Sequence, residues 1–133
     1  MRDINFRVWD NLEKAYLNEK DIAIDSLGNI FILEGYSHND SELWYARILP
    51  DLDNKRYVIE QDTGLKDKNG TKINKGDILI DDTGEPIEYW VVKFSDGGFI
   101  GECTGVAEPL FELTNLEVVG NIHENSELME EKR

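Results

Sequence analysis

The chain has 133 residues, of which 40% are hydrophobic, so it can bury the core of one domain or of two small ones. Lysine and arginine number 14 against 28 aspartate and glutamate residues, and the net charge of −14 repels nucleic acid and anionic membranes. A single cysteine, Cys103, rules out a disulfide within the chain.

The first 60 residues alternate between apolar and polar side chains, which is the period of a β-strand. Residues 36–42 are polar and predict a loop, and Gly35 is expected to close the strand before it. Residues 43–49 fit either a strand or a short helix, which Pro50 ends in both cases. Further strands are expected at residues 4–9, 14–17, 22–24, 30–33 and 56–60.

The second half has clearer strands. The sequence Asp96-Gly97-Gly98 predicts a tight hairpin turn, since glycine supplies the positive φ angles that such turns need. Residues 124–133 are acidic and favour a short helix. Strands are expected at residues 77–80, 87–94, 99–103, 110–113 and 116–122. Five short strands at regular spacing predict a small barrel or roll.

Residues 62–80, DTGLKDKNGTKINKGDILI, hold four of the basic residues and three glycines. A phosphate-binding loop fails here because Asn69 stands where the second glycine is required. A calcium loop fails because Leu65 and Gly76 occupy positions that need acidic ligands. The segment therefore predicts a hairpin turn at residues 68–71, with Ile73, Ile78 and Ile80 buried around it. The alternative is a small basic patch for an acidic partner or for self-association.

Metal and nucleophile chemistry have little support in the sequence. His38, His123 and Cys103 could form a zinc site only if the fold gathered them, because their spacing is not that of zinc ligands. Cys103 lies on an expected hairpin strand, where a cysteine is more often a core residue than a nucleophile. We predict no catalytic, metal or cofactor site, and no enzyme activity.

Aromatic side chains offer a second kind of interaction surface. Trp9, Trp44, Tyr45, Tyr89 and Trp90 could line a barrel face, although packing in the core is the default. Tyr89 and Trp90 are adjacent on one strand and point to opposite faces, so one of them must meet another element, a subunit or solvent. The candidate interaction residues are Trp9, Trp44, Tyr89, Trp90, Lys66, Lys68, Lys72 and Lys75.

Three segments resemble the YopX family of phage and prophage proteins. Residues 62–80 look like the signature of that family. The opening MRDINFRVWDNLEKAYL and the close LEVVGNIHENSELME are similar to its two ends. The resemblance implies a mainly β, β-rich α+β protein: an N-terminal β-rich region at 1–60, an SH3-like barrel at 61–125 and an acidic tail with a short helix at 126–133. It supplies no catalytic residues.

These observations favour a phage or prophage accessory protein that acts without catalysis, through protein contacts and self-association. One alternative is an acidic mimic of nucleic acid that inhibits a host DNA-binding protein. Another is a nucleic-acid-binding module that uses the lysine-rich turn, which the net charge of −14 disfavours. The start of the sequence has no apolar run typical of a signal peptide, and no 18 consecutive residues are apolar. We therefore expect a protein of the bacterial cytoplasm.

Overall fold

The computed structural model describes residues 5–17, 22–38, 41–48 and 56–129, and for residues 32–38 and 41–48 it describes the backbone alone. The chain forms two compact units. One unit consists of Met1–Phe6 with Glu60–Arg133, and the other of Arg7–Ile59. Both units consist mainly of strands, so the predicted mainly β class is confirmed.

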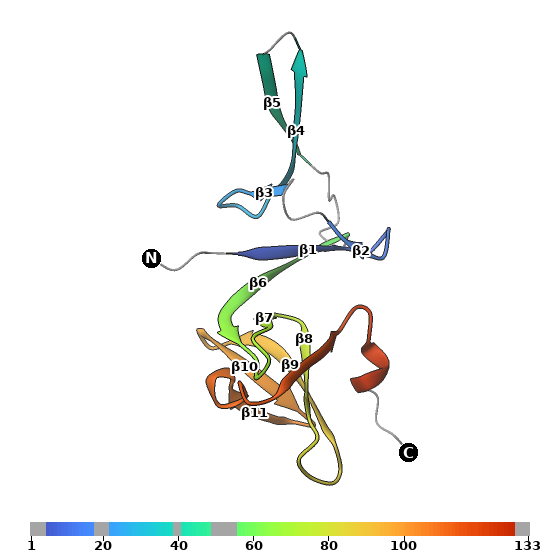
Figure 1. Ribbon diagram of the computed structural model, residues 1–133, viewed down its shortest axis with the longest axis vertical. Coiled ribbons are helices and arrows are strands. Elements are labelled where there is room, and N and C mark those ends of the chain that lie inside the picture. The colour runs from blue at the N-terminus through green and yellow to red at the C-terminus, as the bar shows by residue number, and fades with distance from the viewer. Residues whose placement is uncertain (1–4, 18–21, 39–40, 49–55, 130–133) are drawn as a thin grey trace. The chain divides into compact units, whose positions relative to one another are not determined.

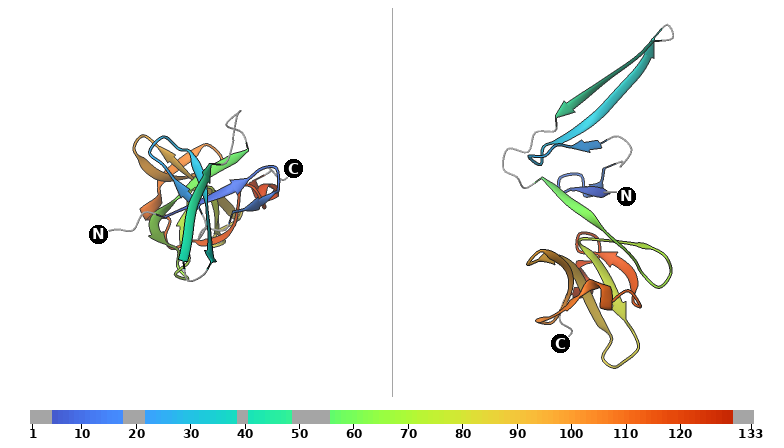
Figure 2. Two further views of the ribbon diagram at one scale, coloured as in Figure 1. Left: turned by 90° about the horizontal axis from the view of Figure 1, so that it is seen from above. Right: turned by 90° about the vertical axis from the view of Figure 1, so that its left-hand side faces the viewer.

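The described strands of the unit of residues 7–59 form three hairpins. Its elements are β1 (Phe6–Asp10), β2 (Ala15–Tyr16), β3 (Ile22–Ile24), β4 (Ile30–His38) and β5 (Ser41–Ile48). The β1–β2 pair is the predicted hairpin, and the rings of Trp9 and Tyr16 meet edge to face at 4.9 Å across it. The strands β3, β4 and β5 form an antiparallel sheet in that order, in which β4 and β5 make a long hairpin (Figures 1 and 2).

Two predictions for this hairpin were wrong. Gly35 does not close a strand, because β4 continues to His38 and its backbone pairs with β5 from Phe31 to His38. Residues 36–38 and 41–42 are therefore strand and not loop, because pairing between backbones requires no apolar side chains. The open choice at residues 43–49 is decided for strand at residues 43–48.

The strand β6 (Tyr57–Lys66) belongs to a second sheet, in the order β2-β1-β6-β7, with β7 at Lys72–Asn74. It is longer than the predicted strand at 56–60 and includes residues 62–66 of the lysine-rich segment. Thr63 is buried and its hydroxyl donates to the Ile73 carbonyl at 2.7 Å, while Gly64 has a φ of 83°. The Asp62 and Thr63 side chains are therefore hydrogen-bonded to backbone groups inside a strand with an irregular register.

The unit formed mainly by residues 60–133 is built on a curved antiparallel sheet of five strands (Figures 1 and 2). Its order is β11-β10-β9-β8-β12, where β8 is Asp77–Asp81, β9 Glu88–Ser95, β10 Gly98–Cys103, β11 Val106–Pro109 and β12 Glu117–Asn121. The strand β11 was not predicted. The likeness to an SH3 barrel stays a prediction.

One face of this sheet carries the core. The core residues are Ile73, Leu79, Trp90, Val92, Cys103, Leu110, Leu113 and Leu116. Leu110 and Leu113 lie in and just after the 3-10 helix η2 (Leu110–Glu112), so the predicted strand at 110–113 was wrong. Both leucines are buried and three residues apart, which is the period of a 3-10 helix. Gly101 lets Leu113 approach the sheet, because a Cβ there would overlap the Leu113 side chain.

The acidic tail contains a second 3-10 helix, η3 (Ser126–Met129), within the segment expected to be a short helix. Within the part of the chain that the structure describes, no helix has the length and apolar character needed to cross a membrane.

Candidate interaction surfaces

Two of the predicted aromatic residues are internal. Trp9 is 3% exposed and Trp90 is 7% exposed, so neither indole is presented to a partner. Trp90 points into the core, and Tyr89 is half-buried on the opposite face, as their adjacency on one strand predicts. Trp44 and Tyr45 lie on β5, where side chains are outside the described residues.

The predicted lysines lie on and beside the β6–β7 hairpin. Lys66 and Lys72 are direct cross-strand partners, Lys68 follows in the turn, and all three side chains are exposed. We call these three residues the lysine hairpin. Lys75 is exposed in the turn after β7, at the other end of that strand. Like charges placed directly opposite on a sheet destabilise it, so the Lys66–Lys72 pair has an energetic cost to the isolated chain.

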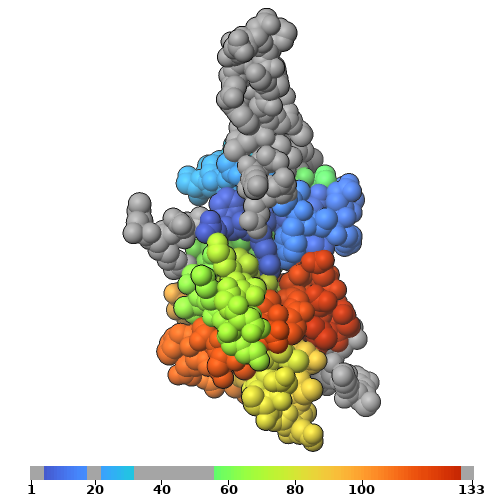
Figure 3. Space-filling model, viewed as in Figure 1, coloured from blue at the N-terminus to red at the C-terminus, as the bar shows by residue number. Residues whose placement is uncertain are grey.

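Asp67 fixes the backbone of the lysine hairpin. Its carboxylate is buried and accepts bonds from the amides of Asn69 and Thr71, and from Val118 of β12, each at 2.9 Å. Burial raises the pKa of the Asp67 carboxyl, but the three amides lower it further, so the pKa lies below its usual value. In Figure 3 the hairpin, in light green, lies at the surface beside the orange segment that leads into β12.

A second surface consists of phenylalanines that sequence reasoning did not select. Phe94 and Phe99 are cross-strand partners at the β9–β10 hairpin, and their rings meet edge to face at 5.1 Å. Phe94 is 52% exposed, and Phe111 of η2 is 67% exposed. Because Ile100 pairs with Pro109, the chain continues from Pro109 into η2 at the same end of β10 as Phe99. We call Phe94, Phe99 and Phe111 the phenylalanine patch.

A third surface is the acidic loop, which we define as residues 81–88, from the last residue of β8 to the first residue of β9. It contains Asp81, Asp82, Glu85 and Glu88 and no basic residue, and residues 82–88 are all exposed. Asp81 accepts bonds from the hydroxyl and the amide of Thr83, and these bonds lower the pKa of the Asp81 carboxyl. Ile87 is an exposed apolar residue within this negative surface.

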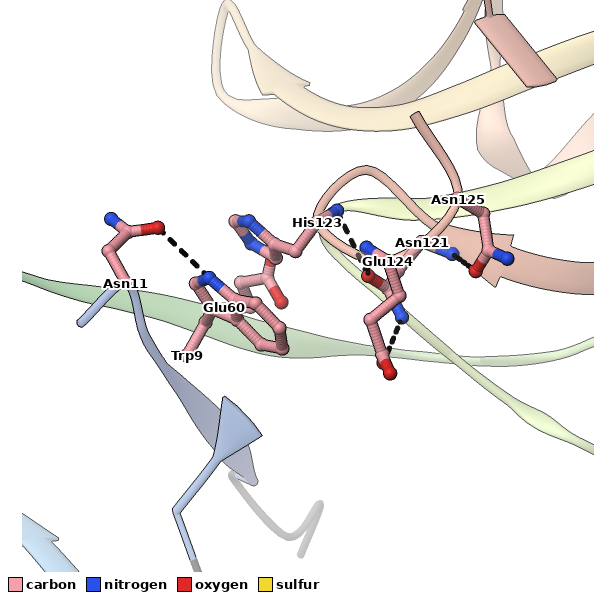
Figure 4. Close-up of polar contacts among 7 residues, drawn as sticks. All are labelled: Trp9, Asn11, Glu60, Asn121, His123, Glu124 and Asn125. Atoms are coloured by element: carbon pink, nitrogen blue, oxygen red, sulfur yellow. Dashed lines mark hydrogen bonds and ion pairs between the residues drawn. The ribbon is translucent and has the colours of Figure 1, made fainter. Parts of the chain in front are cut away.

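Glu60 and His123 form a buried polar contact in the same unit (Figure 4). The Glu60 side chain is nearly inaccessible, and its Oε2 lies 3.1 Å from His123 Nε2. The turn that holds His123 is fixed by Asn121, whose Oδ1 accepts from the amides of His123 and Glu124 at 3.0 Å. Asn125 Oδ1 in turn accepts from the Asn121 amide at 3.1 Å.

The part of the chain described here shows no candidate metal site. Among those residues, no three His, Cys, Asp or Glu side chains are grouped so that they could hold a metal ion. The side chain of His38 is outside them. Cys103 is buried in the core, where burial raises the pKa of its thiol, and its Sγ lies 3.8 Å from Glu88 Oε2. A thiol with a raised pKa beside a carboxylate is a poor nucleophile.

The family model described as YopX protein matches residues 5–130. The chain belongs to the YopX family. It is also similar to a solved structure, described as the crystal structure of protein EF1440 from Enterococcus faecalis. The two sequences are 29% identical, the match covers 98% of this chain and 100% of the other, and the TM-score is 0.68. A search of curated proteins finds no match.

Proposed function

We propose that this YopX-family chain is a non-catalytic accessory protein of a phage or prophage, and that it works by binding another protein through the phenylalanine patch. The exposure of Phe94 and Phe111 carries the proposal. Aromatic side chains are enriched in protein interfaces and supply much of their binding energy. The phage origin is what the family resemblance implies.

The patch is held in place before any partner binds. Phe94 and Phe99 lie on paired strands near the middle of the five-stranded sheet. Leu110 and Leu113 are buried on either side of Phe111, which fixes η2 against β10. A preformed aromatic surface loses little conformational freedom on binding, so more of the burial energy contributes to affinity.

The test is affinity purification of the tagged chain from its native bacterium during prophage induction. The captured partner is then compared between the wild-type chain and the variant Phe94→Ser/Phe111→Ser. Burying one phenylalanine contributes about 2 kcal/mol, so the double variant should bind the partner several hundredfold more weakly. Both side chains are largely exposed, so the variant should unfold at nearly the wild-type urea concentration.

Val106→Ser is the matched control. Val106 is also an exposed apolar strand residue, but it pairs with Cys103 at the opposite end of β10 from Phe99. The Val106→Ser variant should bind the captured partner as tightly as the wild-type chain does. A partner that binds the double phenylalanine variant as tightly as the wild-type chain would refute the proposed contact surface.

A further inference from the structure

The lysine hairpin carries positive charge that forms no ion pair within the described part of the chain. The nearest acid in sequence, Asp67, is buried and directed at backbone amides. Because the Lys66 and Lys72 side chains repel each other, binding of an anion between them is favoured.

The same compact unit presents the complementary charge. The acidic loop is exposed from residue 82 to residue 88, and Ile87 is an exposed apolar residue within it. Asp82 and Glu85 form no hydrogen bond or ion pair with the described residues. Both surfaces are visible on the face shown in Figure 3, the hairpin in light green and the loop in yellow. Each molecule therefore offers both halves of a charge-complementary contact.

We propose that the lysine hairpin of one copy docks on the acidic loop of a second copy of this chain. Three cations meet four acids, and Ile87 adds an apolar contact among them. The Asp67 bonds hold the hairpin in one conformation, which lowers the entropic cost of docking. Because the two surfaces differ, the contact can be made reciprocally in a two-fold pair or repeated around a ring.

A second copy fits this hairpin better than nucleic acid does. The chain has a net charge of −14, which opposes approach to a polyanion over the whole surface. A second copy is equally acidic in total, but it brings an exposed loop with four acids, no basic residue and one exposed apolar side chain. This inference goes beyond the proposed function, since it concerns another surface and another partner.

The experiment is sedimentation velocity of the full chain and two charge-reversal variants. The first is Lys66→Glu/Lys68→Glu/Lys72→Glu, and the second is Asp82→Lys/Glu85→Lys. The wild-type chain should associate at about 0.05 M salt and dissociate at about 0.5 M salt. Each variant alone should be at least tenfold weaker in self-association. In the first variant both surfaces are negative, and in the second variant the acidic loop has no net charge left to attract the lysine hairpin. An equimolar mixture of the two variants should associate again.

Several results would overturn the inference. These are a wild-type chain that stays monomeric at low salt, a variant that associates like wild type, and a mixture that fails to associate. Binding of duplex DNA that depends on the three lysines, without self-association, would assign the hairpin to nucleic acid instead. All substituted side chains are exposed, and circular dichroism checks that each variant is folded.

Two further variants separate this inference from the proposed function. Lys75→Glu changes an exposed lysine at the other end of β7 and should leave self-association unchanged. Phe94→Ser/Phe111→Ser should self-associate like the wild-type chain, while the charge-reversal variants should still bind the partner captured through the phenylalanine patch. Either proposal can therefore fail while the other stands.

Discussion

Gly76 and Gly70 have similar backbone angles but different surroundings, which makes them a matched pair at the scale of single residues. Their φ angles are 90° and 84°. A Cβ at Gly76 would overlap the buried Glu60 carboxylate, whereas a Cβ at Gly70 would have no heavy atom within 4 Å. Gly70→Ala should lower the free energy of unfolding by about 1 kcal/mol, through the left-handed backbone alone. Gly76→Ala should lower it by about 3 kcal/mol, because the Glu60 carboxylate must also move.

Urea unfolding of both variants measures this difference. If both variants lose the same free energy of unfolding, Glu60 and His123 rearrange without cost. Their contact is then not a fixed part of the structure. The comparison is informative because both substitutions add one methyl group at a positive φ angle. Only the neighbour of that methyl group differs.

Asp67 gives a prediction about pH. Asp67→Asn removes the negative charge that three backbone amides bind, and it should lower the free energy of unfolding by about 2 kcal/mol at neutral pH. The pKa of Asp67 in the folded chain lies below its ordinary value of 3.8. The difference in free energy of unfolding between the wild-type chain and Asp67→Asn should therefore be complete above pH 3.8. It should disappear as the pH falls through the pKa of Asp67 in the folded chain.

Urea unfolding of the wild-type chain and the variant between neutral pH and about pH 2 checks this sign. Asp82→Ala is the control, because it removes an exposed carboxylate and should change the free energy of unfolding by less than about 0.5 kcal/mol. A difference between wild type and Asp67→Asn that grows as the pH falls would contradict the direction of the Asp67 pKa shift.

At the scale of elements, the sequence indicated most strands but missed those whose polar residues are satisfied inside the fold. Asp62, Thr63 and Gly64 look like turn residues, yet they belong to β6. Thr63 is buried because its hydroxyl finds the Ile73 carbonyl, a partner ten residues later that no local pattern reveals. Leu110 and Leu113 were misassigned for a related reason, since a four-residue segment is too short to separate a strand from a 3-10 helix.

Of the candidate surfaces, the sequence predicted the lysine hairpin but not the phenylalanine patch. The exposed lysines follow from an Asn-Gly turn that local chemistry specifies, and the turn is present. The phenylalanine patch could not be read from the sequence, because Phe94 continues the alternation of Trp90 and Val92 on the core face. It is exposed because the strand extends beyond the core at the hairpin, and the extent of a core is a property of the fold.

The lysine hairpin gives a prediction in which stability and association change in opposite directions. Lys72→Glu places a carboxylate directly opposite Lys66 and replaces a repulsive cross-strand pair by an attractive one. The free energy of unfolding should rise by about 0.5 kcal/mol, measured in urea at a concentration where the chain is monomeric. Self-association should weaken in the same variant. Lys75→Glu changes a residue that lies outside the β6–β7 pairs, so it should not raise stability.

At the scale of the whole molecule, the net charge of −14 should give two opposite responses to salt. Repulsion among the acids destabilises the compact state, so raising the salt from about 0.05 M to about 0.5 M should raise the melting temperature by about 4 °C. The same salt should dissociate copies joined by the lysine hairpin and the acidic loop. Dilute thermal unfolding measures the first response, and sedimentation velocity measures the second.

The charge-reversal variants test whether repulsion among the acids causes the melting temperature to rise with salt. Lys66→Glu/Lys68→Glu/Lys72→Glu makes the chain more negative than −14, so its melting temperature should rise more steeply with salt. Asp82→Lys/Glu85→Lys makes the chain less negative, and its response should be smaller. A wild-type melting temperature that falls with salt would mean that attractive pairs such as Asp10–Arg56, at 3.0 Å, outweigh the repulsion. The acidity of the chain would then have no measurable cost in stability, and ordinary solubility would be enough to explain it.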